Sequence, residues 1–346
     1  MRSSLILAVT LLFLALLPVS LRSPVFAQEA PSPGAPPPAT DAPPPPPDEN
    51  DAATMNINVN LVNLYFSAFD KNGFVTNLVK SDCVVAENKV PQTIRNFTQE
   101  KNLPLTIGIL LDTSGSQQNV LPLEKESTAT FLRDVLTPKD EAFLISFDIN
   151  VDLLADYTNR ASEISRALNK ASINTGATYG SVTGNGNPRG TLLFDAVYLA
   201  AHDKLSMEAG RKVLVLLTDG GDQGSQETLK TATEAAQKAN AIVYVILIAD
   251  TGFYSSQGLM YSGSGDMQRL TSDTGGRVIN VGHDGRRLED ALNQIQDELR
   301  TQYLLSYTPT NPKADGTFRK IELNCGKLKV QTRTGYYAIS ASDAGN

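Results

Sequence analysis

The pattern of apolar and polar residues divides the chain into a central region and two flanks. Between about residues 105 and 302, apolar runs alternate with amphipathic segments in which apolar residues recur every three or four positions. Runs such as 105–112 (LTIGILLD) and 241–249 (AIVYVILIA) are almost wholly apolar, which predicts strands buried on both faces of a sheet. Amphipathic segments such as 161–171 predict helices that cover those faces. We therefore expect an α/β fold with a Rossmann-like, doubly wound and mostly parallel sheet. The predicted strands are 105–112, 141–147, 151–157, 212–219, 241–249 and 277–281, and the predicted helices are 124–136, 161–171, 192–205, 226–240 and 288–299.

The two flanks show a different pattern, with short alternating segments separated by turn residues, as is typical of antiparallel strands. We expect these strands to pair into one small antiparallel β-unit into which the α/β region is inserted. The predicted strands are 57–70, 83–88 and 92–97 before the insertion, and 302–309, 318–325 and 328–338 after it. The expected organisation is a flank at 55–103, an α/β domain at 104–302 and a second flank with its tail at 303–346.

The first 27 residues have the composition of an export signal. Arg2 precedes an uncharged apolar stretch at 5–17, and Pro18 is followed by Val25 and Ala27 at the −3 and −1 positions of a cleavage site. An uncleaved membrane anchor is the alternative, but a true span needs about 20 apolar residues. No later segment is apolar enough to span a bilayer. We expect a bacterial protein that is exported to the periplasm, the cell envelope or the medium.

Residues 28–54 form a proline-rich linker that holds about half of the chain's 19 prolines. A run of this kind lacks backbone donors and is expected to form an extended polyproline II spacer. A docking site for a polyproline-reading partner is the alternative.

Charge and cysteine content narrow the classes of partner. The net charge is −7 and no cluster of Lys and Arg stands out, which argues against nucleic acid and anionic membrane surfaces as partners. The two cysteines, Cys83 and Cys325, lie in no metal-binding pattern. In an oxidising compartment they are expected to form one disulfide between the two flanks. Two separately buried thiols are the alternative.

The apolar run 105–112 ends in an unusual group of oxygen-bearing side chains, in the stretch LTIGILLDTSGS. Asp112, Ser114 and Ser116 follow one another within a single turn. Asp219 ends another apolar strand, and Thr191 opens a predicted helix. In an open α/β sheet these positions meet beyond the carboxyl ends of the strands, where ligands bind. Such hard oxygen donors favour Mg²⁺ or Mn²⁺, with Ca²⁺ a weaker candidate.

Each of these residues also has a purely structural interpretation. Ser114, Ser116 and Thr191 could cap helices or turns, and the sequence TDG around Asp219 is common in turns. Their order along the chain and their positions at strand ends favour a shared metal site.

The segment 105–302 resembles a von Willebrand factor type A (VWFA) domain. DTSGS, GTLLFDA and LTDG match the metal-ion-dependent adhesion site (MIDAS) of that family, and the flanks YLLSYTPTNPKADGTFRKIEL and GYYA resemble its exported acidobacterial-type branch. The resemblance implies that Ser114, Ser116 and Thr191 contact the metal directly, while Asp112 and Asp219 act largely through water. It also implies that a carboxylate of a partner protein completes the coordination. Two long loops, 177–190 and 250–266, depart from the family pattern and could shape the rim of the site.

These observations predict a metal-dependent protein-binding or adhesion module rather than an enzyme. The partner would be a protein that supplies an Asp or Glu. Two other functions are alternatives: an envelope scaffold with a stabilising metal, and a metal-assisted hydrolase. A hydrolase has little support, because the only histidines, His202 and His283, lie near no recognisable nucleophile.

Overall fold

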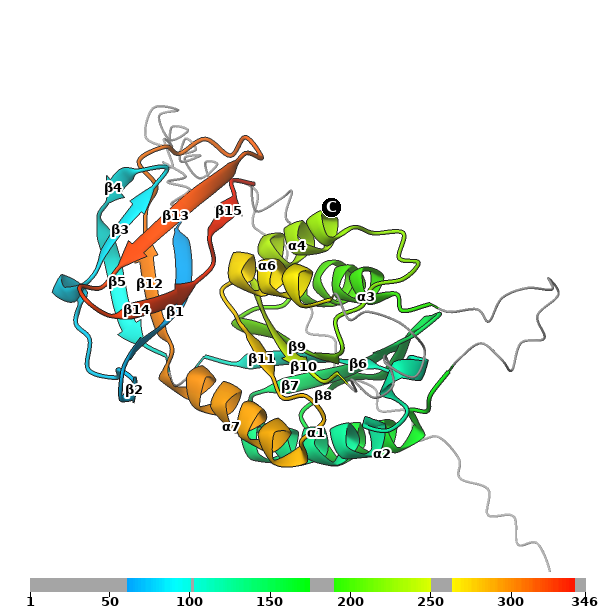
Figure 1. Cartoon of the computed structure of the whole chain (residues 1–346). Helices are drawn as coiled ribbons and strands as arrows, with labels where there is room; N and C mark the ends of the chain where they lie inside the picture. The colour runs from blue at the N-terminus through cyan, green and yellow to red at the C-terminus, as the bar shows by residue number, and fades with distance from the viewer. Residues whose placement is uncertain (1–60, 101–102, 175–189, 250–262, 340–346) are drawn as a thin grey trace, which may run out of the picture. The chain divides into compact units, whose positions relative to one another are not determined.

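The computed structural model describes residues 61–100, 103–174, 190–249 and 263–339 (Figure 1). The chain divides into two compact units, Met1–Ile57 and Asn58–Asn346, and every described residue belongs to the second. The expected signal peptide (1–27) and proline-rich linker (28–54) lie outside the described residues, as does most of the two long loops. Within the described residues, no helix combines the length and the apolar character needed to cross a bilayer.

A six-stranded sheet forms the centre of the second unit, in the order β11-β10-β9-β6-β7-β8. All neighbouring strands are parallel except β8, which runs antiparallel to β7. β6 and β9 are buried at every position, which explains why their sequences are continuously apolar. The prediction of a mostly parallel sheet is confirmed. The strands are β6 (Leu105–Asp112), β7 (Glu141–Phe147), β8 (Val151–Thr158), β9 (Arg211–Thr218), β10 (Ala241–Leu247) and β11 (Val278–Asn280).

Helices cover both faces of this sheet (Figure 1). The helices α1, α2 and α7 contribute to one hydrophobic core, and α3, α4 and α6 contribute to the other. Local sequence fixes several helix ends: the Thr228 side chain accepts a hydrogen bond from the amide of Thr231 at the start of α4, and Gly275 ends α6 in the left-handed conformation. The helices are α1 (Leu121–Val135), α2 (Ala161–Lys170), α3 (Leu193–Leu199), α4 (Leu229–Lys238), α6 (Ser264–Thr274) and α7 (Gly285–Thr301).

The structure differs from the predicted elements in two places within this α/β region. Helix α6 was not predicted, and the segment expected to be one helix at 192–205 changes at Ala200 from α-helix to a π-helical segment, Ala200–Leu205. The missed helix buries two threonines, Thr271 and Thr274, beside Met267 and Leu270. Its buried stripe is therefore half polar, and the apolar periodicity that indicates a helix is weak there.

The two flanks pair with each other in two antiparallel sheets. In the first, of order β14-β1-β12-β5 with β2 beside β1, strand β1 from before the α/β region pairs with β12 from after it. In the second, of order β15-β13-β3-β4, β3 and β13 pair in the same way. The segment 328–338, predicted as one strand, is divided between the two sheets as β14 and β15. The strands are β1 (Val62–Asp70), β2 (Gly73–Phe74), β3 (Val84–Glu87), β4 (Val90–Gln92), β5 (Ile94–Gln99), β12 (Tyr303–Tyr307), β13 (Phe318–Asn324), β14 (Lys329–Thr332) and β15 (Gly335–Tyr337).

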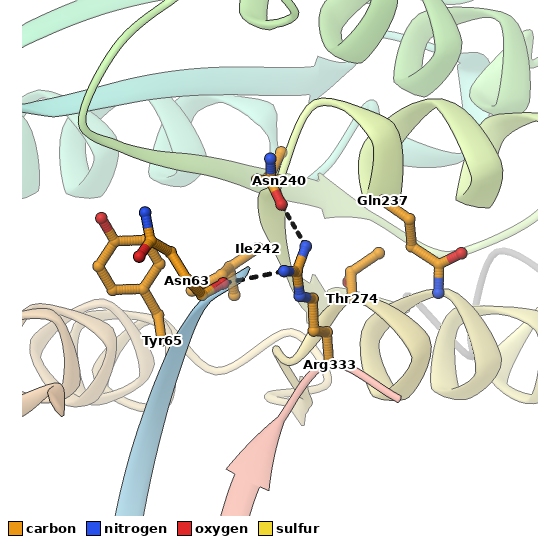
Figure 2. A pocket seen from close by; sticks show the side chains of 8 residues that line it. Asn63, Tyr65, Gln237, Asn240, Ile242, Thr274 and Arg333 are labelled. Atoms are coloured by element: carbon orange, nitrogen blue, oxygen red, sulfur yellow. Dashed lines mark hydrogen bonds between the residues drawn. The ribbon is translucent and has the colours of Figure 1, made fainter. Parts of the chain in front are cut away.

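Covalent and polar contacts tie the flanks together and to the α/β region. The predicted disulfide is present between Cys83 and Cys325, which are 242 positions apart. A small polar pocket lies where the flanks meet the α/β region (Figure 2). In it, the Arg333 guanidinium donates hydrogen bonds to the Asn240 side chain and, over 2.8 Å, to the backbone oxygen of Asn63. The second flank is therefore anchored through Arg333 both to the first flank and to the α/β region.

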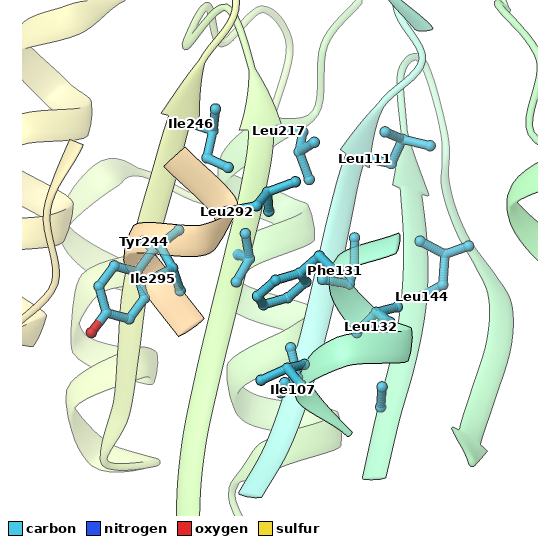
Figure 3. Close-up of a cluster of buried hydrophobic side chains, with 14 of the residues drawn as sticks. Ile107, Leu111, Phe131, Leu132, Leu144, Leu217, Tyr244, Ile246, Leu292 and Ile295 are labelled. Carbon is cyan, nitrogen blue, oxygen red and sulfur yellow. The ribbon is translucent and has the colours of Figure 1, made fainter. Parts of the chain in front are cut away.

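The side chains packed between the central strands and the helices α1 and α7 form an apolar core (Figure 3). Leu111 of β6 and Leu217 of β9 are both fully buried and belong to one cluster with Phe131 of α1 and Leu292 of α7. Leu111 and Leu217 are in register, and side chains alternate along a strand, so Asp112 and Thr218 lie together on the opposite face of the sheet. Asp219 is the first residue after β9.

Candidate metal centre

Asp112 is the last residue of β6 and is completely buried. One carboxylate oxygen, Oδ1, accepts a hydrogen bond from the amide of Ser114 over 3.0 Å, and Oδ2 accepts one from the Thr218 hydroxyl over 2.6 Å. Thr218 ends β9, the neighbouring strand, so the sheet register itself places this donor. Both of these donors are neutral, so they do not neutralise the carboxylate.

The turn after Asp112 brings two hydroxyl groups together. Ser114 Oγ and Ser116 Oγ are 3.1 Å apart. Ser114 occupies the N-cap position of the short 3₁₀ helix Gly115–Gln117, yet its side chain makes no capping hydrogen bond. The helix-capping interpretation therefore does not account for Ser114. The two hydroxyls are hydrogen-bonded to each other, which places two oxygen atoms side by side in the turn after Asp112.

Asp219 lies at the carboxyl end of β9 and is 2% exposed. Its Oδ1 accepts a hydrogen bond from the amide of Gly221 over 3.1 Å, so the loop that follows β9 folds back around the carboxylate. The negative charge of Asp219 is close enough to Asp112 to raise the pKa of that carboxyl. The two aspartates predicted from the sequence are thus neighbours at one edge of the sheet.

Thr191 reaches this edge through backbone pairing rather than through a strand of its own. Its amide and carbonyl both pair with Gln223, over 2.9 Å each, in an isolated antiparallel bridge. Gln223 belongs to the loop that starts at Asp219, so Thr191 is attached to the same loop. The N-cap of α3 is Leu192, so Thr191 does not hold the N-cap position that the structural interpretation assigned to it.

Further contacts hold the start of α3 and the loop after Asp219 in place. The carboxylate of Asp195 accepts hydrogen bonds from the amides of Gln226 and Glu227, and Asp222 accepts one from the amide of Phe194 over 3.2 Å. The carboxylates of Asp195 and Asp222 thus serve as hydrogen-bond acceptors for backbone amides. The loop is therefore fixed by its own polar contacts, which is the property a site assembled from several loops requires.

The electrostatics of the edge favour a bound cation. Burial, and next the charge of Asp219, raise the pKa of Asp112 to about 7 from its usual 3.8, although the hydrogen bonds from Ser114 and Thr218 act in the opposite direction. The charge of Asp219 disfavours the ionised form of Asp112, and a cation between the two carboxyls would remove that repulsion. The two carboxyls and the hydroxyls of Ser114 and Ser116 are hard-oxygen donors of the type that suits Mg²⁺ or Mn²⁺.

One acidic residue near this site was missed by the sequence prediction. Glu124, in the first turn of α1, is completely buried, and its pKa is raised well above the usual 4.5 by burial and then by the charges of Asp112 and Asp219. The sequence contained a signal for it, because Glu124 occupies a position on the buried stripe of α1 between Leu121 and Thr128. An acid at an apolar position of a helix is the kind of exception that marks a site.

The three acids do not form a conventional carboxylate cluster. Among the described residues, no group of three or more His, Cys, Asp or Glu side chains has the geometry to hold a metal ion. A metal at this edge would therefore depend on the hydroxyl groups as well as on the two aspartates.

Comparison with known proteins gives distant structural similarities only. No family model and no curated protein matches this chain. Among solved structures, BatB from Bacteroides thetaiotaomicron is 17% identical, with a TM-score of 0.43 over 57% of this chain and 99% of that one. The VWA domain of SpRpn10 is 14% identical, with a TM-score of 0.39 over 56% and 95%. The proximal thread matrix protein 1 of the mussel byssus, solved with a zinc-occupied MIDAS motif, is 17% identical, with a TM-score of 0.44 over 60% and 48%.

Proposed function

We propose that this chain is an exported, metal-dependent protein-binding module of the VWFA type. Asp112, Ser114, Ser116, Thr191 and Asp219 would hold Mg²⁺ or Mn²⁺, with Ca²⁺ a weaker candidate. The observation that carries the proposal is the pair of serine hydroxyls 3.1 Å apart beside a buried aspartate, with no capping hydrogen bond from Ser114.

The neutral and the acidic residues of the proposed site would have different roles. The neutral hydroxyls of Ser114, Ser116 and Thr191 would supply oxygen donors without cancelling the cation's charge, while the two aspartates orient the site from within the sheet. The bound cation would keep enough positive charge to attract an Asp or Glu of another protein. Specificity for the partner would come from the loops around this edge, so the function is recognition without bond breaking.

An exported location is consistent with the disulfide. A bridge between Cys83 and Cys325 persists in oxidising compartments and is rare in the cytosol. With the expected signal peptide at 1–27, it supports a periplasmic, envelope or secreted protein. The proline-rich linker at 28–54 would then act as a spacer between the folded unit and whatever precedes it.

The histidines give no support to a hydrolase. His202 Nδ1 lies 2.7 Å from Asp203 Oδ1 and its ring stacks on Tyr198, and both groups of this pair are substantially exposed. His283 is exposed in the turn that precedes α7. Neither residue lies in the elements that carry Asp112 and Asp219, so we propose that the chain is not an enzyme.

The decisive experiment separates metal binding from partner binding. Mn²⁺ binding to the wild-type protein and to Ser116→Ala would be measured by calorimetry. Capture of envelope proteins by the immobilised protein would then be compared in Mg²⁺ and in EDTA, with Ser116→Ala as the control. Metal binding with metal-dependent capture supports the proposal. If the protein binds metal but capture is unchanged by EDTA and by Ser116→Ala, the result would favour a scaffold with a stabilising metal.

A further inference from the structure

Glu124 is a buried acid whose carboxyl has no hydrogen-bond partner among the described residues. It lies on the inner face of α1 with 0% exposure, and neither carboxylate oxygen has a hydrogen-bond partner. An ionised carboxylate buried without donors is strongly unfavourable, and buried acids are ordinarily hydrogen-bonded or paired with a cation. The described residues offer Glu124 neither.

The basic side chains around it are engaged elsewhere. Lys125, the next residue, donates to the backbone oxygen of Ala171. The two buried basic residues of β9, Arg211 and Lys212, lie at the start of that strand, at the opposite edge of the sheet from Asp219. Their side chains donate to backbone oxygens there. Within the part of the chain that the structure describes, no basic side chain donates to the carboxyl of Glu124.

Glu124 is nevertheless electrostatically connected to the candidate metal centre. After burial, the charges of Asp112 and Asp219 are the causes that raise its pKa. A second unsatisfied group lies in the same region: Gln117 directly follows Ser116, is 0% exposed, and leaves Oε1 without a partner while its Nε2 donates to the Ile248 oxygen over 3.4 Å. Carboxyl and amide oxygens without hydrogen-bond partners therefore occur at Glu124 and Gln117, both buried near the candidate metal centre.

The position of Glu124 excludes a role as a third direct carboxylate ligand, because the three acids do not form a metal-holding cluster. We propose that Glu124 is a positioning acid of the metal centre: a buried third carboxyl that would supply negative charge when a divalent cation is bound, raise the affinity for that cation, and act through water or through the metal ligands. This inference rests on the proposed metal site and adds to it a residue outside the motif. Partners of this indirect kind typically change metal affinity about 10- to 100-fold when they are removed.

The test compares variants that separate charge from shape. Glu124→Gln keeps the size of the side chain and removes the charge, and Glu124→Asp keeps the charge on a shorter side chain. Thr128→Val is the matched control, because Thr128 lies one turn further along the same buried face, is 0% exposed, and has a hydroxyl without a partner. Free Mn²⁺ would be followed by electron paramagnetic resonance during titration, and the metal-free unfolding temperature would be measured in EDTA.

We expect Glu124→Gln to weaken Mn²⁺ binding about 10- to 100-fold and to raise the metal-free unfolding temperature. We expect Glu124→Asp to keep most of the affinity and Thr128→Val to leave it unchanged. Opposite effects on affinity and stability cannot come from a damaged fold. Unchanged affinity in Glu124→Gln, or an equal loss in Thr128→Val or Glu124→Asp, would overturn the role of Glu124 while leaving the metal site intact. If the wild-type protein binds no Mn²⁺, both this inference and the proposed metal site fail.

Discussion

Replacing Asp112 with asparagine should make the metal-free protein more stable. The carboxyl is completely buried and its pKa is about 7, against a usual value of 3.8, chiefly because of burial and then because of Asp219. Above pH 7 Asp112 is ionised in the folded protein, although burial makes its ionised form less favourable there than in the unfolded chain. At about 1.4 kcal/mol per pKa unit, the cost approaches about 4 kcal/mol. Asparagine carries no charge and avoids this cost.

The substitution also removes part of a hydrogen-bond network. The amide of Ser114 and the hydroxyl of Thr218 donate to separate carboxylate oxygens, whereas an amide side chain offers one oxygen. Losing one of these bonds costs about 1–2 kcal/mol. The net gain at pH 8 is then about 2–3 kcal/mol, which corresponds to a rise of roughly 3–5 °C in the unfolding temperature for a unit of this size.

The assay is thermal and urea unfolding in EDTA between pH 4 and pH 8. Because the folded-state pKa is raised, folded Asp112 binds more protons than unfolded Asp112 between pH 3.8 and about 7. The stability of the wild type should fall through this window as the pH rises, and the advantage of Asp112→Asn should grow. With Mn²⁺ at pH 8, only the wild type should gain stability.

Asp148→Asn is the matched control. Asp148 directly follows β7, is 4% exposed, and accepts hydrogen bonds from the Thr113 hydroxyl, the Asn150 amide and the Asn174 side chain. Neutralising it should lower the free energy of unfolding, because these donors lose a charged acceptor. If Asp112→Asn is also less stable than the wild type at every pH in EDTA, the reasoning from burial and repulsion is wrong.

Three further predictions concern the disulfide, a hydroxyl donor and the pH dependence of metal binding. Replacing Cys83 and Cys325 with serine opens a cross-link that spans 242 positions and should lower the free energy of unfolding by up to about 5 kcal/mol in urea titrations; an unchanged midpoint would contradict this. Ser116→Ala should weaken Mn²⁺ binding at least about tenfold with little change in metal-free stability, because Ser116 is only half-buried; calorimetry and unfolding in EDTA check the two parts, and unaltered affinity would exclude this hydroxyl as a ligand. Because the pKa of Asp112 is about 7, protons should compete with the metal, and Mn²⁺ affinity should fall about tenfold per pH unit below 7; affinity that is constant from pH 5.5 to 8 would refute this.

Much of the fold was predictable because the central strands are buried on both faces. Runs such as 105–112 and 241–249 are apolar throughout, and only a covered parallel sheet buries such runs completely. Helix α6 was missed for the converse reason. Its buried stripe includes Thr271 and Thr274, whose hydroxyls donate to backbone oxygens of their own helix, so polar residues can lie inside without outside partners.

The candidate site was predictable only where chain order fixes position. Asp112 and Asp219 end strands that are neighbours in the sheet, so their proximity follows from the fold class. Thr191 depends on a backbone bridge to Gln223 that no residue pattern indicates. Glu124 gave a weaker signal: an acid in an amphipathic helix normally faces solvent, and its place on the buried stripe of α1 between Leu121 and Thr128 is the one indication that it does not.

The buried acids of the α/β region fall into two kinds, and the difference between them is the physical argument for a cation. Asp140 accepts hydrogen bonds from the amides of Leu105 and Thr137 and from the Thr137 hydroxyl, and Asp148 is similarly supplied by three donors. These acids hold loops together and need no further partner. The pKa of Asp112 is about 7 despite hydrogen bonds from Ser114 and Thr218, and the oxygens of Glu124 have no partner. Both acids are connected electrostatically to Asp219. The unfavourable burial of Asp112 and Glu124 is therefore found at the sheet edge that carries Ser114 and Ser116, where a divalent cation would relieve it.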